Sequence, residues 1–170
     1  LEAVKKAMFP PFEMPVIVDP RGAYTTAAAA VGKMYALSMK LGLGDLKGKK
    51  VAVLAGTGPV GMAAVKIFAL EGADVVVTSR SLERAKAVAE RVNREVGAEK
   101  VRGVQAAKPE EIGVAISDAD MILATGAAGV QLLPLSVLKE YGKRCRIVAD
   151  VNAVPPTGIE GLSPKDDGKE

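Results

Sequence analysis

The sequence predicts an α/β fold built on a doubly wound parallel sheet. Three observations support this prediction: short apolar runs typical of strands, helical segments between successive runs, and a glycine-rich turn directly after the first of them. Strands that alternate with helices favour parallel pairing through right-handed crossovers. Runs that are apolar throughout are typical of strands buried on both faces of such a sheet.

The strands are expected at residues 51–55, 74–78, 101–105, 121–124 and 146–150. The helices between them are expected at residues 59–71, 82–96, 109–116 and 132–141. Ser81 precedes the second of these helices and is a favoured N-cap residue, and Pro134 is expected in the first turn of the last one.

The residues ahead of the first strand follow a different pattern. Residues 1–8 read as the end of a helix stopped by two prolines, and residues 16–18 read as a short strand closed by a turn. A helix over residues 27–40 is expected, with Thr25 or Thr26 as its cap. The chain therefore divides into residues 1–45, a nucleotide-binding domain at 46–153 and a polar segment at 154–170, and we expect a fragment of a longer protein.

Composition excludes several chemistries. The net charge is +3 with acidic and basic residues interleaved, so no nucleic-acid partner is expected. The sequence contains no His, which removes Ser-His-Asp and Cys-His catalysis and most zinc sites, so no metal is expected. Its one cysteine, Cys145, lies in an apolar run and reads as a structural thiol. A signal peptide and a membrane-spanning apolar run are both lacking, which favours a cytoplasmic protein without a membrane partner.

A G-x-G-x-x-G motif lies between the first expected strand and the helix that follows it. Its residues are Gly56, Thr57, Gly58, Pro59, Val60 and Gly61. In this context the first glycine is expected to allow a sharp turn, the second to let a pyrophosphate approach the backbone, and the third to let the helix pack closely. The motif therefore predicts a Rossmann-type dinucleotide site in which phosphates face a helix N-terminus.

The end of the second strand indicates which dinucleotide binds. Sites for NAD usually place an acid about 20 residues after the loop, to bind the ribose 2′-hydroxyl. Here that region offers Ser79, Arg80 and Ser81, and Arg84 lies one turn into the next helix. Because arginine pairs with phosphate and a carboxylate would repel it, we predict NADP as the cofactor.

Two further loops are expected at the same crevice. Thr125, Gly126 and Ala127 follow the fourth strand, where small residues leave room for the nicotinamide ribose. Asn152 follows the fifth strand and is a candidate hydrogen-bond partner for the nicotinamide end. Asp150 is expected to act there, or as an N-cap or an ion-pair partner.

Three stretches of this sequence resemble the NADP-dependent methylene-tetrahydromethanopterin dehydrogenases. They are VLAGTGPVGM at residues 53–62, IVADVNAVPPTGI at residues 147–159 and DPRGAYTTAAA at residues 19–29. The resemblance covers essentially the whole chain. It implies hydride transfer from the methylene group of a reduced pterin to NADP+, giving the methenyl form in one-carbon metabolism, and some members also accept methylene-tetrahydrofolate.

The resemblance also implies how the chain is organised around its substrate. Residues 1–45 would be the last part of an N-terminal pterin-binding domain with its connecting helix, and residues 154–170 would lead to a further C-terminal part. Asp19, Thr25 and Thr26 would lie near the pterin cleft, with helix capping and a turn aspartate as their alternative roles. No catalytic residue is assigned, and a homo-oligomer is expected.

Other functions remain open on the same fold. One is another NADP-dependent dehydrogenase, of the shikimate dehydrogenase-like or glutamyl-tRNA reductase-like type. A second is a module that senses NADP(H) without catalysis. A binder of S-adenosylmethionine or a mononucleotide is disfavoured, because such sites prefer a carboxylate at the end of the second strand.

Overall fold

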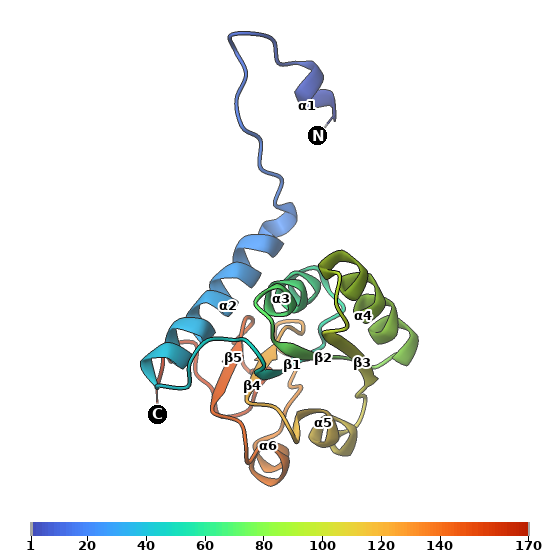
Figure 1. The fold of residues 1–170 in the computed structure, drawn as a ribbon. Helices are drawn as coiled ribbons and strands as arrows, with labels where there is room; N and C mark the ends of the chain where they lie inside the picture. The colour runs from blue at the N-terminus through green and yellow to red at the C-terminus, as the bar shows by residue number, and fades with distance from the viewer. Residues whose placement is uncertain (1, 170) are drawn as a thin grey trace.

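A computed structural model describes residues 2–169 and shows a parallel sheet with helices on both faces (Figure 1). The strands are β1 (Lys50–Leu54), β2 (Asp74–Ser79), β3 (Val101–Gln105), β4 (Met121–Ala124) and β5 (Ile147–Asp150). They lie in the order β3-β2-β1-β4-β5, and every neighbouring pair is parallel. The predicted doubly wound parallel sheet is confirmed.

The helices form one layer on each face of the sheet (Figure 1). The first layer contains α2 (Ala23–Lys40), α3 (Pro59–Leu70) and α4 (Leu82–Val96), and the second contains α5 (Pro109–Ile116) and α6 (Leu135–Tyr141). The strand order reverses between the neighbours β1 and β4. Ligands of open α/β sheets bind at such a reversal, outside the carboxyl ends of the strands.

The central strands β1 and β4 are buried on both faces because each face carries its own apolar core. Along β1, Val51 and Val53 pack into the core beneath α2, α3 and α4, whereas Ala52 and Leu54 pack into the core beneath α5 and α6. This division follows from the alternation of side chains along a strand. It explains why the sequences of these two central strands show no polar alternation.

A buried asparagine fixes the end of α4 against β3. The Asn93 side-chain amide donates to the carbonyl of Val101 at 2.9 Å and to the Glu99 carboxylate at 3.0 Å. Its oxygen accepts from the backbone N–H groups of Lys100 and Val101 at 3.0 and 2.8 Å. One side chain thereby satisfies the backbone of the turn that leads into the third strand.

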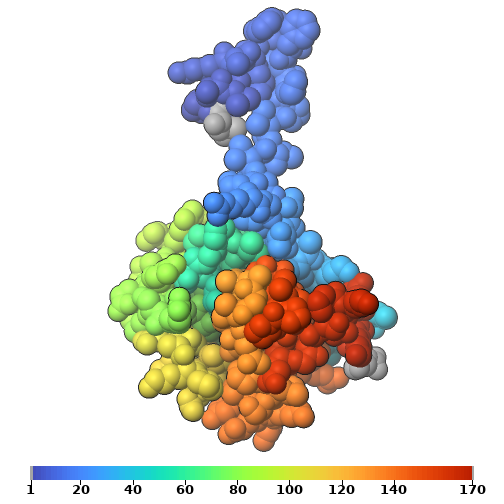
Figure 2. Space-filling view, turned by 180° about the vertical axis from the view of Figure 1, so that it is seen from behind, coloured from blue at the N-terminus to red at the C-terminus, as the bar shows by residue number. Residues whose placement is uncertain are grey.

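The segment ahead of α2 departs from its predicted structure. Residues 16–18 form no strand, and Ile17 is 90% exposed. They have the composition of a strand but no described strand beside them with which to pair. The short helices α1 (Glu2–Lys6) and η1 (Pro20–Gly22) flank this extended arm, which stands away from the body in both views (Figures 1 and 2).

Two helix starts also differ from the prediction. Helix α2 begins at Ala23 with Gly22 at its N-cap, so neither predicted threonine caps it. Helix α6 begins at Leu135, and Pro134 is its N-cap residue and not part of its first turn. None of the helices within residues 2–169 has the length and apolar content to span a bilayer.

We expect Asn93→Ala to lower the free energy of unfolding by about 3 kcal/mol, because it leaves buried backbone groups without partners. Urea unfolding followed by circular dichroism measures this loss. The exposed neighbour Arg94→Ala is the control and should change stability by less than about 0.5 kcal/mol. Equal stabilities of the two variants would contradict the role given to Asn93.

Candidate functional site

The loop that leaves β1 is tied to the end of β2. The backbone N–H of Ala55 donates to the Thr78 hydroxyl at 3.0 Å, and the N–H of Gly56 donates to the Thr78 carbonyl at 3.0 Å. The sequence assigned the sharp turn to Gly56, but the residue in the left-handed region is Ala55, with φ of 53°. The turn is therefore made one residue earlier than predicted.

The three glycines of the loop have different environments. A Cβ on Gly61 would lie 2.5 Å from the Cα of Gly56, and a Cβ on Gly56 would lie 2.7 Å from Cγ2 of Val77. Both glycines are therefore needed for packing. A Cβ on Gly58 would meet no atom within 4 Å, so the space above this residue is open.

The open space lies at the N-terminus of α3. Gly58 is the N-cap and Pro59 the first helical residue, and no side chain caps the helix. The N–H groups of Val60 and Gly61 fall in the first turn, where a helix offers them no internal partner. Such N–H groups, together with the positive end of the helix dipole, favour an anion.

Polar groups gather where β2 meets α4. Ser79 is buried, and its hydroxyl accepts from the N–H of Ser81 at 3.3 Å. The Ser81 hydroxyl accepts from the N–H of Arg84 at 3.3 Å, which confirms Ser81 as the N-cap of α4. Arg80 and Arg84 are exposed, and neither guanidinium forms an ion pair within residues 2–169. These residues offer two free cations beside two serines.

Sequence reasoning missed one acid at this position. The Ser81 hydroxyl donates to the Glu83 carboxylate at 2.8 Å. The backbone N–H of Glu83 itself, followed by the Ser81 hydroxyl, lowers the pKa of the Glu83 carboxyl below its usual range. Glu83 is the second residue of the predicted helix and lies beyond the strand end, where the acid of an NAD site is usual.

The loop after β4 is held to the neighbouring strands. The hydroxyl and the N–H of Thr125 both donate to the carbonyl of Leu54, at 2.9 and 3.0 Å. The Asn152 side-chain amide donates to the carbonyl of Gly126. The side-chain N–H of Asn152 thus holds the loop after β4 in position. The side-chain oxygen of Asn152 accepts no hydrogen bond within the described residues. Ala127, next in the chain, is exposed.

Asp150 organises the segment that follows β5. Its carboxylate accepts from the N–H of Asn152 at 2.9 Å and from the N–H of Gly158 at 2.7 Å. The Gly158 carbonyl accepts in turn from the N–H groups of Leu132 and Leu133, at 2.8 and 2.9 Å. Asp150 therefore acts neither as a helix N-cap nor, within residues 2–169, in an ion pair. We call these contacts the Asp150 clasp.

The three predicted substrate-side residues lie at the start of α2. Asp19 accepts from the N–H of Tyr24 at 2.7 Å and from the Thr25 hydroxyl at 2.7 Å, and these bonds lower the pKa of its carboxyl. Asp19 thus supplies the capping that the sequence assigned to a threonine. Thr26 lines a hollow of about 950 Å³ between α2, the outer edge of β5 and residues 161–169.

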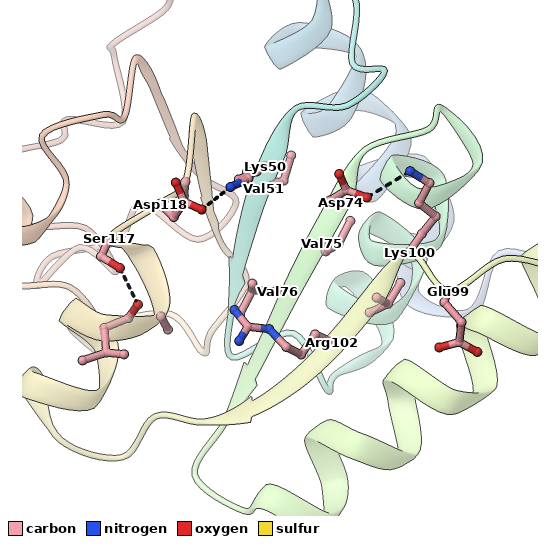
Figure 3. A pocket seen from close by; sticks show the side chains of 14 residues that line it. Lys50, Val51, Asp74, Val75, Val76, Glu99, Lys100, Arg102, Ser117 and Asp118 are labelled. Carbon is pink, nitrogen blue, oxygen red and sulfur yellow. Dashed lines mark hydrogen bonds and ion pairs between the residues drawn. The ribbon is translucent and has the colours of Figure 1, made fainter.

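A second hollow, of about 510 Å³, lies at the amino ends of β1, β2 and β3, at the opposite end of the strands from the glycine loop (Figure 3). Lys50 pairs there with Asp118, and Lys100 pairs with Asp74 at 2.9 Å. It is far along the strands from the glycine loop and is not part of the candidate site. Residues 2–169 hold no cluster of three or more acidic or cysteine side chains that suits a metal ion.

Comparison with known proteins shows the family to which the chain belongs. The chain matches the family described as Shikimate / quinate 5-dehydrogenase over residues 37–157. It is 43% identical over 169 residues to the bifunctional protein MdtA of Methylorubrum extorquens, covering 99% of this chain and 57% of that protein. It is 40% identical over 164 residues to the NAD(P)-dependent methylenetetrahydromethanopterin dehydrogenase of the same organism, covering 95% and 54%. The chain thus spans little more than half of each relative.

Solved structures show the same fold at lower identity. An L-alanine dehydrogenase superposes with a TM-score of 0.64 at 21% identity, over 86% of this chain and 42% of that one. A dipicolinate synthase chain from Bacillus halodurans gives 0.57 at 24% identity, over 84% and 43%. The chain therefore belongs to the shikimate/quinate 5-dehydrogenase family, and its resemblance to the methylene-tetrahydromethanopterin dehydrogenases is confirmed by the two relatives from Methylorubrum extorquens.

Proposed function

We propose that this chain is the coenzyme-binding part of an NADP-dependent methylene-tetrahydropterin dehydrogenase. The enzyme transfers hydride from methylene-tetrahydromethanopterin, or from methylene-tetrahydrofolate, to NADP+ and leaves the methenyl form. The observation that carries the proposal is the pairing of an open glycine loop with a basic strand end. The relatives' names supply the substrate class.

The residues present fit a bound dinucleotide. The open space at Gly58 leaves room for a pyrophosphate, and the N–H groups of Val60 and Gly61 are available to it. Arg80 and Arg84 offer guanidinium groups for a 2′-phosphate. A nicotinamide ring held at this edge supplies the acceptor for the hydride.

The chain's own residues bind and orient, and they need to move no proton. The substrate carbon that loses hydride lies between two nitrogens, whose lone pairs stabilise the resulting cation. A sequence without His suits such a reaction. Thr125, Asn152 and Asp150 hold the loops after β4 and β5 in place, so that two rings can meet face to face.

The family match over residues 37–157 favours a second candidate, a dehydrogenase acting on shikimate or quinate. The two candidates differ in substrate and share the coenzyme site. We also propose that the protein is a cytoplasmic homo-oligomer. The exposed apolar side chains of the N-terminal arm, such as Phe12 and Ile17, support association.

The activity assay mixes NADP+ and methylene-tetrahydromethanopterin, or methylene-tetrahydrofolate, with the protein expressed from its complete reading frame. We expect methenyl absorbance to rise together with NADPH. Turnover of shikimate or quinate alone would favour the second candidate. Tight NADP+ binding with no turnover of any of these substrates would indicate a sensing module.

Substituting Arg80→Ala should weaken NADP+ binding at least tenfold, because a charge-assisted hydrogen bond is lost, and should change NAD+ binding little. Isothermal titration calorimetry with both coenzymes measures the difference. Arg94→Ala, in the last turn of α4 and far from Arg80, is the control for the change in net charge. An equal loss of affinity for both coenzymes would refute the 2′-phosphate role.

Two glycine variants separate binding from folding. Gly58→Ala should leave the thermal midpoint within a few degrees of wild type and weaken both coenzymes at least tenfold, because its methyl group enters the open space. Gly61→Ala should lower the free energy of unfolding by about 2 kcal/mol, because its methyl group meets backbone. A Gly58→Ala protein that bound coenzyme normally would place the pyrophosphate elsewhere.

A further inference from the structure

The segment where β2 meets α4 carries charges of both signs, from Arg80 and Arg84 and from Glu83. We propose that Glu83 is a specificity-determining residue that makes the ribose pocket accept NAD as well as NADP. Its carboxylate accepts the ribose 2′-hydroxyl of NAD and opposes the 2′-phosphate of NADP. The inference rests on the proposed function, because it concerns the same pocket.

The Ser81 hydroxyl already uses its one donor proton within the protein. A serine hydroxyl has one proton to donate. Ser81 donates it to Glu83 at 2.8 Å, and its oxygen accepts from the N–H of Arg84 at 3.3 Å. A 2′-phosphate accepts hydrogen bonds from protein donors, so it competes with Glu83 for this proton. The predicted phosphate ligand Ser81 is therefore already engaged.

The second step is electrostatic. Two groups within hydrogen-bond reach of the same hydroxyl oxygen lie roughly 4 to 5 Å apart. At about 4 Å in water, repulsion between two unit negative charges weakens binding roughly fivefold. Arg80 and Arg84 attract the phosphate and offset this repulsion. The pocket thus holds opposing determinants within one short segment.

The third step concerns NAD. Its ribose 2′-hydroxyl can donate to a carboxylate, which is the role an acid plays at the end of the second strand in NAD sites. The strand end here lacks an acid, and Glu83 places one a few residues later, in the first turn of α4. The two arginines leave this hydrogen bond intact because they flank the serine and do not pair with Glu83.

The Glu83 side chain contributes little to the stability of the fold, so a substitution there tests coenzyme binding. It is exposed, and its one described side-chain partner is the Ser81 hydroxyl. The cap of α4 depends on the Ser81 oxygen and not on the carboxylate. Replacing the acid by its neutral isostere therefore leaves the fold in place.

The test measures the dissociation constants of NADP+ and NAD+ by calorimetry on wild type and Glu83→Gln. We expect the NADP+ constant to fall about fivefold and the NAD+ constant to rise about twofold, which moves selectivity about tenfold toward NADP. The gain for NADP+ should shrink when salt rises from about 0.05 M to about 0.5 M, because exposed charges are then screened. Circular dichroism of the variant checks that the fold is retained.

The matched control is Glu90→Gln, which removes the same charge from an exposed position two turns further along α4. It should leave the selectivity within about twofold of wild type. An unchanged ratio of the two constants in Glu83→Gln, or an equal shift in the control, overturns the inference. If Arg80→Ala in that case weakens NADP+ binding and leaves NAD+ binding nearly unchanged, the proposed function stands. A wild-type protein that binds neither coenzyme overturns both.

Discussion

The contact between α3 and the end of β1 determines the geometry of the whole site. Gly61 packs against the backbone of Gly56 at a distance that leaves no room for a side chain. This contact brings the helix N-terminus to the carboxyl edge of the sheet, where its free N–H groups face the crevice. The bonds from Ala55 and Gly56 to Thr78 then fix the same loop to β2. The proposed sites for the pyrophosphate and for the adenosine ribose therefore both depend on this one contact.

Much of the fold could be predicted from the sequence because its signals are local. The central strands are uninterrupted apolar runs, and the glycine spacing predicts the loop between β1 and α3, although the left-handed residue of its turn is Ala55. Ser81 has a capping side chain directly ahead of an amphipathic helix, and the structure places it at the N-cap of α4. At residues 16–18 the same kind of signal failed. A segment rich in β-branched residues forms a strand only when another strand lies beside it to pair with. The sequence of the segment alone does not show whether such a partner is present.

The site was predictable in its parts and not in its connections. The sequence showed that Asp150 ends a strand and that Asn152 follows it, but it did not show their partners, Gly158 further along the same segment and Gly126 in the loop after β4. Which backbone groups they satisfy depends on how these two loops converge. Asp19 and Thr25 likewise bond to each other, a pairing that arises only when the turn folds back on the first turn of α2. Glu83 carries no distinctive sequence signal, since an acid in the first turn of a helix is ordinary.

The Asp150 clasp joins the segment after β5 to the crevice itself. The N–H of Gly158 donates to the Asp150 carboxylate, and its carbonyl accepts from two N–H groups of the stretch ahead of α6, so Gly158 ties the segment after β5 to both. Ile159, next to this glycine, is fully buried. Local unfolding of this segment would remove one wall of the crevice. Under the proposed function, coenzyme occupancy and the resistance of this stretch to proteases are linked, since a ligand that binds only the folded segment stabilises it against local unfolding.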